Sequence, residues 1–297
     1  MSAPQVAGRE PGGAGGSVAL GAPRLVLAWP ALAAYGMVHV ACLGLLWTGV
    51  DRTALAVFAA CYVVRLFGLT VCYHRYFAHR AFKTSRAMQL VLAVVGSLTM
   101  QGGVIWWAET HRRHHRNADT PDDLHSPQYQ GFWYSHFGWF LNKEHRATRL
   151  AAIPDLARYP ELVWLDRWHV VPFLVLATGL GMVFGARAVL CGAFVPTVIL
   201  WEYTHWVQSF SHCWGGYRRW ESADRSRNHW LLGVITFGEF HNNHHRFPSS
   251  AKQGCVWWEL DLGYWSLRAL AALGLVWDVR VPAVAAAEIP GPEGGRA

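Results

Sequence analysis

Histidine is the residue type in this chain whose number and spacing most clearly indicate chemistry. The chain has 297 residues and 16 histidines, eight of which fall in three short boxes. Box one contains His74 and His79. Boxes two and three share the pattern H-x-x-H-H and contain, in order, His111, His114, His115, His241, His244 and His245. On a helix, positions i, i+3 and i+4 place three imidazoles on one face. Neutral imidazole is a common metal ligand that suits iron, copper and zinc.

The number of histidines predicts more than one metal ion. Eight imidazoles exceed the first shell of a single ion, which holds about four to six ligands. We therefore expect two metals. Zinc is an alternative, but it usually takes three or four ligands that include thiolates or a carboxylate. The three boxes contain no cysteine. The six cysteines of the chain are scattered without a C-x-x-C pair, and we expect neither a disulfide nor a zinc–thiolate site.

The composition of the chain is that of an integral membrane protein. Hydrophobic residues make up 53% and charged residues 15%, against roughly 25% charged in a typical soluble domain. The 17 tryptophans suit the interface between membrane and water. This composition excludes a disordered chain, a coiled coil and a nucleic-acid tail protein. The net charge of +7 indicates basic cytoplasmic loops rather than a nucleic-acid partner.

Five apolar stretches are candidates to position the boxes, because a membrane helix needs about 20 apolar residues. They are residues 25–50, 53–71, 88–107, 170–184 and 186–207. If the boxes build one site, the stretch 88–107 cannot cross, since it would separate box one from box two. The sequence Gln101-Gly102-Gly103 interrupts it. We expect four spanning helices in two hairpins, with a tight turn near Gly185.

The orientation follows from the arginines and lysines. They gather beside boxes one and two, whereas the opposite side offers little more than Arg52 and Arg187. The positive-inside bias places the boxes and both termini in the cytoplasm. The predicted fold is therefore an all-α integral membrane protein: four transmembrane helices in two hairpins, an interfacial helix, and a cytoplasmic helical cap holding a histidine-rich two-metal site. We expect tails without structure over residues 1–22 and 281–297, around one membrane domain at 23–280.

Three segments carry a resemblance to a known family. They are residues 74–86 (HRYFAHRAFKTSR), residues 109–119 (ETHRRHHRNAD) and the stretch from Ser211, which includes SHCWGGYRRW and SRNHWLLGVITFGEFHNNHHRFPSSAKQG. Their order and surroundings resemble the membrane fatty acid desaturases, specifically the acyl-CoA delta-9 (stearoyl-CoA) branch and its bacterial relatives. The resemblance covers roughly residues 25–280.

The resemblance implies a non-haem di-iron centre that uses O₂ as co-substrate. Nine histidines would bind the two irons: the eight of the boxes and His212, which matches the family's histidine after the last span. The family has an asparagine four residues before that histidine, which holds a water on one iron. Here Gln208 takes its place, and the longer amide leaves the water ligand in question. Box three reads Gly238-Glu239-Phe240-His241, one residue shorter than G-E-G-x-H in bacterial relatives.

The resemblance also suggests residues that contact the acyl chain. Gln101, Trp107 and Thr204 occupy positions resembling those that bend the chain in the family. An alternative for Trp107 is an interface anchor. Carboxylates near the boxes could orient imidazole N–H groups, with Glu239 favoured over Glu109, Asp119, Asp122, Asp123 and Asp224. Of the remaining histidines, His125 and His229 lie near enough to the boxes for a supporting role.

The activity implied is desaturation of a saturated acyl chain at the bacterial inner membrane. The substrate would be acyl-CoA or another acyl carrier, and basic residues around the boxes could receive its anionic headgroup. The chain has only Pro11-Gly-Gly in place of the H-P-G-G of fused cytochrome b5 domains. We therefore expect a separate electron donor, a ferredoxin or cytochrome b5-like protein with its reductase. Hydroxylation, acetylenation and a non-catalytic metal-binding protein remain alternatives.

Overall fold

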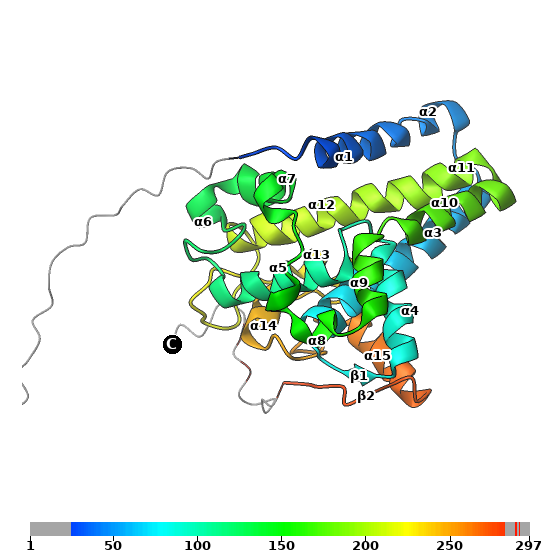
Figure 1. Ribbon diagram of the computed structural model, residues 1–297. Coiled ribbons are helices and arrows are strands. Elements are labelled where there is room, and N and C mark those ends of the chain that lie inside the picture. Colours follow the sequence, from blue (N-terminus) through cyan, green and yellow to red (C-terminus); the bar gives the residue numbers. More distant parts are fainter. Residues whose placement is uncertain (1–24, 283–288, 290, 292–297) are drawn as a thin grey trace, which may run out of the picture.

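The computed structural model describes residues 25–282, 289 and 291. Their regular secondary structure is almost entirely helical, with one antiparallel pair of two-residue strands, β1 (Lys83–Thr84) and β2 (Val276–Trp277). The predicted tail 1–22 and most of the predicted tail 281–297 lie outside the described residues. Figure 1 shows α1, α3, α10 and α12 running alongside one another, with α5, α14 and α15 gathered at one side of this layer.

Three helices of the described chain are long and apolar enough to cross a membrane. They are Trp29–Thr48, made of α1 (Trp29–Cys42) and α2 (Leu45–Thr48); Arg52–Ala78, made of α3 (Arg52–Phe67) and η1 (Gly68–Ala78); and Ala186–His212, made of α11 (Ala186–Val189), η5 (Leu190–Phe194), α12 (Val195–Ser209) and η6 (Phe210–His212). They contain the predicted stretches 53–71 and 186–207 and most of 25–50. The second and third extend beyond them, so that His74 and His212 lie within continuous helices.

The predicted fourth span, 170–184, is shorter and is bent. The helix α10 (Val171–Phe184) follows α9 (Pro160–Arg167) at an angle of 65°, and the two pass the length test only together. The tight turn after α10 is confirmed, because Gly185 has a φ of 80°, a conformation that glycine adopts without a steric penalty. By length and composition the described chain thus offers three spans, or four if the bent pair is one.

The stretch 88–107 forms two helices instead of one. Helix α4 (Arg86–Ser97) ends before the Gln101-Gly102-Gly103 sequence, and α5 (Val104–Asn117) begins after it. With 12 residues, α4 is about 18 Å long, short of the roughly 30 Å hydrocarbon core of a bilayer. Asp166 on α9 receives the backbone N–H groups of Ile105 and Trp106 at 2.8 and 2.9 Å, and so caps α5.

The remaining short elements surround box two and box three. They are α6 (Pro127–Gln130), η2 (Tyr134–Gly138), α7 (Trp139–Leu141), η3 (Lys143–His145), η4 (Leu150–Ala152), α8 (Pro154–Ala157), α13 (Trp230–Ile235), α14 (His241–Arg246) and α15 (Leu262–Ala272). Helix α14 carries all of box three. Most of these helices are too short to be stable alone, so the packing of the whole cap decides where the histidines lie.

The apolar residues divide between a buried core and an exposed surface. The core centres on η1, α4 and α5 and includes Tyr73, Phe77 and Ile105. By contrast, Met182 on α10 and Leu46 on α2 are 83% and 79% exposed. Large apolar surfaces are rare on soluble monomers. Because Met182 and Leu46 lie on candidate membrane spans, their exposure is consistent with contact with lipid.

Arg75, one of the basic residues beside box one, is a structural arginine of the core. Its side chain is completely buried. The guanidinium lies 3.0 Å from Asp261 and donates to the carbonyl oxygens of Thr70, Gly238 and Ala251. A buried arginine is tolerated only with such partners. These contacts join η1, which carries box one, to the segments on either side of box three.

Candidate metal centre

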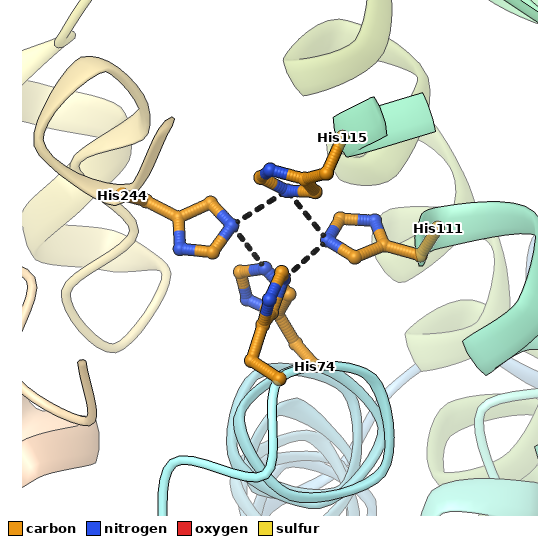
Figure 2. A group of neighbouring side chains, drawn as sticks. His74, His111, His115 and His244 are labelled. Atoms are coloured by element: carbon orange, nitrogen blue, oxygen red, sulfur yellow. Dashed lines mark hydrogen bonds between the residues drawn. The ribbon is translucent and has the colours of Figure 1, made fainter. Parts of the chain in front are cut away.

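The nine histidines named from the sequence lie in two groups, one of five and one of four. Within each group, the nitrogens available to a metal all lie within 4.8 Å of one another. The first group contains His74, His79, His111, His115 and His244, and the second contains His114, His212, His241 and His245. Figure 2 shows four imidazoles of the first group directed toward a common centre. The two groups correspond in number to the two metals that the sequence predicts.

Box one owes its geometry to an unusual helix. The segment η1 is a π-helix, in which the backbone N–H of His79 bonds to the carbonyl of His74, five residues earlier, at 3.1 Å. One turn therefore separates the two histidines, and their ring centroids are 4.9 Å apart. In an α-helix, residues five apart would point in clearly different directions. Gly68 at the start of η1 permits close packing on α4, because a Cβ there would lie 2.5 Å from the carbonyl oxygen of Val95.

Boxes two and three each contribute to both groups. On α5, His111 and His115 join the first group and His114 joins the second; on α14, His244 joins the first group and His241 joins the second, together with His245. The spacing correctly places each box on one helical face. The histidine-bearing faces of α5 and α14 therefore each supply side chains to both groups. The shorter entry into box three does not remove its histidines from the groups.

The nitrogens of each group are as close as ligands of one ion. Around the first group, the contacts from His244 Nε2 to His74 Nε2 and to His115 Nε2 are both 2.9 Å, and His111 Nε2 lies 3.1 Å from His115 Nε2. In the second group, His212 Nε2 lies 2.8 Å from His241 Nε2. His212 stands at the end of η6, and only the family resemblance, not its spacing, singled it out.

Four carboxylates stand behind the imidazoles. Asp123 lies 3.0 Å from His114 Nδ1, Asp119 lies 2.8 Å from His212 Nδ1, and Asp224 lies 3.2 Å from His245 Nδ1. Glu239 lies 3.0 Å from His74 Nδ1 and 3.8 Å from His241 Nδ1, so that it contacts one histidine of each group. Glu109 instead pairs with Arg149, and Asp122 is exposed.

Burial keeps most of the imidazoles neutral and their carboxylate partners ionised. Desolvation holds the pKa well below its usual value for His79, His111, His115, His241 and His244. Although burial opposes ionisation of Asp119, its hydrogen bond to His212 lowers its pKa to about 2. Burial also opposes ionisation of Glu239, but its interactions with His74, His241 and Arg75 together lower its pKa. Neutral imidazole is the form that binds a metal.

The protonation pattern leaves lone pairs facing one another. A carboxylate only accepts hydrogen bonds, so each carboxylate partner holds the imidazole proton on Nδ1. For His212 this leaves Nε2 with a lone pair, 2.8 Å from His241 Nε2. Second-shell carboxylates orient metal-bound histidines in this way. The nine candidate ligands are therefore all imidazole nitrogens, with no thiolate among them. Such a set fits two metal ions that prefer imidazole ligands.

A large apolar cavity leads to the two groups. Its volume is about 590 Å³, and its walls come from α1, α5, α10 and α12. A smaller cavity of about 50 Å³ lies against His74 and His111 of the first group and His114 and His241 of the second. The two cavities share five lining residues: Trp107, His111, His125, Thr204 and Gln208. An apolar ligand of the size that proteins bind in cavities of several hundred Å³ would thus end beside the imidazoles.

The three predicted acyl contacts form one hydrogen-bonded unit in this wall. The amide Nε2 of Gln101 donates to Thr204 Oγ1 at 2.8 Å, and the indole N–H of Trp107 donates to Gln101 Oε1 at 3.3 Å. All three line the large cavity. Trp107 is 9% exposed and stacks on His111 at 4.8 Å. It is therefore buried beside the first histidine group.

Two further residues occupy the junction of the cavities. Gln208 accepts from the indole N–H of Trp139 at 3.0 Å through Oε1, which engages the amide that the resemblance assigned to a water. His125 stacks on His114 at 4.3 Å, in agreement with a supporting place beside box two. His229 instead packs against Phe210. Trp139 was not among the residues expected from the sequence.

Together, these features define a class of protein: an apolar helical protein with a histidine-rich centre suited to two metals at the end of an apolar cavity. The sequence model of the fatty acid desaturase family matches residues 52–280. The chain belongs to the fatty acid desaturase family, and it is an oxidoreductase that acts on fatty acids.

Curated relatives cover most of the chain. An sn-2 palmitoyl-lipid 9-desaturase from Nostoc sp. (strain 36) is 40% identical over 70% of this chain and 74% of its own length. The delta-9 acyl-lipid desaturase 1 of Arabidopsis thaliana is 38% identical over 77% and 76%. A hex-5-enoyl-[acyl-carrier protein] acetylenase from Moorena producens (strain JHB) is 36% identical over 80% and 79%.

Proposed function

We propose that this protein is an O₂-dependent desaturase that introduces a cis double bond at the delta-9 position of a saturated acyl chain. The observation that carries the proposal is the junction of the two cavities, where an apolar space of about 590 Å³ adjoins a smaller one that touches both histidine groups. Relatives named 9-desaturases support the position of the double bond. An acyl chain has no polar group near its middle, so its position must be set by the shape of the cavity.

The nine histidines would hold two irons, five ligands on one side and four on the other. Imidazole-bound iron supplies the reduction of O₂ and an oxidant strong enough to remove hydrogen from an unactivated C–H bond. This chain's residues do the rest. The carboxylates Asp119, Asp123, Asp224 and Glu239 hold the imidazoles in one tautomer and orientation.

The acyl chain would bend at Gln101, Trp107 and Thr204. The hydrogen bonds among these three residues hold one wall of the cavity beside His111. The apolar walls exclude water from the reacting carbons. Residues of α1 and α10, such as Val38 and Phe173, also line the cavity, and we propose that the methyl end of the chain lies against them.

Replacing Thr204 by valine should weaken the control of double-bond position. The variant keeps the side-chain shape but removes the hydroxyl that receives Gln101. One hydrogen bond is worth about 0.5–1.5 kcal/mol, so kcat/KM should fall about 2- to 10-fold, and products with shifted double bonds should appear. Mass spectrometry of disulfide adducts of the product locates the bond. Thr48→Val on α2, far along the chain and outside the cavity wall, should produce a single isomer; a mixture there too would contradict the assignment.

Arg146 is placed to receive an anionic headgroup. It is an arginine among the residues that line the large cavity, and its guanidinium lies 5.8 Å from the Trp106 ring. We expect Arg146→Gln to raise KM for acyl-CoA on the order of 10-fold with little change in kcat, because a charge-assisted hydrogen bond contributes about 1.5–3 kcal/mol. Initial rates in membranes at varied acyl-CoA measure this. Arg158→Gln, at an exposed arginine outside the cavity, is the matched control, and an equal change in both variants would refute the role.

In the membrane we propose four crossings in two hairpins, with α9 and α10 forming the bent third crossing and α4 lying in the interface. The histidine groups and both termini would face the cytoplasm of a bacterial inner membrane. What supports this is that boxes one, two and three meet at one site, which requires them to share a side of the bilayer.

Electrons would come from a separate ferredoxin or cytochrome b5-like protein with its reductase. The exposed Arg225 supports a docking position near the metals. Its backbone N–H donates to Asp119 at 2.7 Å, and Asp119 in turn contacts His212. A basic surface this close to a ligand suits an acidic donor protein.

The test is expression in a bacterium that makes no such unsaturated acid, followed by mass spectrometry of total fatty acids, phospholipid chains and acyl-CoA. A new delta-9 monounsaturated acid supports the proposal, and the pool in which it first appears identifies the carrier. Acetylenation is a second candidate because of the Moorena producens relative, and an alkyne product would favour it. A folded, iron-loaded protein that oxidises no acyl chain with ferredoxin or cytochrome b5 would refute both.

A further inference from the structure

A second cluster of metal-binding side chains lies apart from the nine histidines. His136 on η2 joins Glu202 and His205 on α12, and their ligand atoms are within 4.8 Å of one another. His39 on α1 also faces this cluster, with its Nε2 at 3.6 Å from Glu202 Oε1. Helix α1 lies alongside α12 in the fold (Figure 1). Three separate elements therefore bring three imidazoles around one carboxylate.

The hydrogen bonds determine which nitrogens carry protons. His39 Nδ1 lies 2.8 Å from the carbonyl oxygen of Tyr35, which only accepts, so in the neutral form of His39 the proton is on Nδ1. Ser209 donates its hydroxyl proton to the carbonyl of His205 and therefore accepts from His136 Nδ1, at 2.8 Å. In both imidazoles Nε2 is left with a lone pair.

These lone pairs face the carboxylate of Glu202 instead of donating to it. The distances are 3.6 Å from His39 Nε2 and 3.8 Å from His136 Nε2. The phenol of Tyr35 donates to Glu202 Oε1 at 2.8 Å. Burial lowers the pKa of His136, which favours the neutral ring. The arrangement is rich in acceptors around a negative charge, and a cation at its centre would complete it.

His205 adds an independent observation. The residue is 6% exposed, and its Nδ1 has no hydrogen-bond partner among the described residues. This nitrogen is directed at the same carboxylate, 3.7 Å from Glu202 Oε1. An unpartnered buried polar atom is costly. Glu202 lies within a candidate membrane span, where an ionised side chain normally has a partner and a function.

From this geometry we infer that His39, His136, Glu202 and His205 form a third metal site, for a divalent transition ion of which Zn²⁺ fits best. Zinc is bound tetrahedrally by nitrogen and carboxylate oxygen at about 2.0–2.2 Å, which puts neighbouring ligand atoms about 3.4 Å apart. The observed separations from Glu202 are 3.6, 3.7 and 3.8 Å. His136, Glu202 and His205 already lie within 4.8 Å of one another, whereas His39 stands outside that group and would have to move further to become the fourth ligand.

The ion would fasten α1 to the wall of the acyl cavity. Tyr35 and His205 both line the large cavity, and Tyr35 stacks on Trp201 at 5.2 Å. Helix α1 otherwise exposes much of its apolar surface, as Met37 and Val40 show. A metal shared by α1, η2 and α12 would therefore help to set the position of a helix that exposes much of its surface. The site is structural and is separate from the nine histidines of the proposed iron centre.

The experiment counts metals in the full-length protein. Wild type, Glu202→Gln and the double variant His136→Gln/Glu202→Gln are purified in detergent after growth with iron and zinc. Iron plus zinc is then measured by mass spectrometry against amino-acid analysis. We expect about three metals per chain in wild type and about two in the variants. Glu221→Gln makes the same charge change at an exposed glutamate and should keep three.

A spectroscopic measurement on wild type covers the case in which a variant fails to fold. Co²⁺ added to the iron-loaded protein should produce the intense visible bands of a tetrahedral site, and one equivalent of Zn²⁺ should remove them. A count of two metals in wild type, or no tetrahedral cobalt spectrum, would overturn the inference and leave the cluster as a proton-sharing network. The count and the spectrum are independent of desaturase activity, so they distinguish failure here from failure of the proposed function.

Discussion

Changing His244 to alanine is expected to abolish desaturation. His244 Nε2 lies 2.9 Å from both His74 Nε2 and His115 Nε2, at the meeting point of all three boxes. Activity should fall more than roughly 100-fold, since even the loss of a residue behind a metal ligand costs about 10- to 100-fold. The iron content should fall from about two per chain toward one. Product analysis and metal analysis of the same preparation measure both effects.

The control for this variant is His145→Ala. His145 lies outside both groups and contacts the phenol of Tyr134 at 3.2 Å. It should keep about two irons of the desaturase centre and most of the activity. If His244→Ala retained full iron and activity, the first histidine group would not be the metal centre.

Changing Glu239 to glutamine is expected to impair both metal positions at once. Its carboxylate contacts His74 of the first group and His241 of the second. Glutamine keeps the size but loses the charge that holds the proton on Nδ1. Because such partners contribute about 10- to 100-fold to metal affinity or activity, we expect a loss of that size. The iron dissociation rate in the presence of a chelator should rise for both ions.

Glu109→Gln is the matched control. Glu109 is on α5, close in sequence to box two, but its carboxylate pairs with Arg149. The same change of charge there should leave iron retention close to that of wild type. Equal chelator sensitivity of the two variants would mean that Glu239 acts through general stability and not through the imidazoles.

The sequence predicted which histidines belong to the metal centre better than it predicted how they divide between the two groups. The H-x-x-H-H spacing correctly placed three imidazoles on one face of α5 and of α14. The spacing could not show that His114 belongs to the second group while His111 and His115 belong to the first. That division depends on where the neighbouring helices end. The i, i+5 spacing of box one matched no ordinary helix, and it makes sense only on the π-helix η1.

Supporting residues were even harder to assign. Six carboxylates near the boxes were candidates, with Glu239 favoured, and four of them contact imidazoles. Glu109 turns to Arg149. Arg75 follows His74 among the basic residues beside box one, and it forms a buried link to Asp261. The direction in which a side chain points depends on tertiary packing. The residues next to it in the sequence do not predict that packing.

Residue types and short-range spacing by themselves determined the membrane character, the break in the stretch 88–107, the eight box histidines and the resemblance to fatty acid desaturases. These properties are local, since apolar length, helix periodicity and glycine conformation act over a few residues. Tertiary structure alone decided the division of nine imidazoles into five and four, the carboxylate behind each, and the cavity that ends at Gln101, Trp107 and Thr204. The reason is that each joins residues from helices far apart in sequence, and only the packing of those helices sets the distances between them.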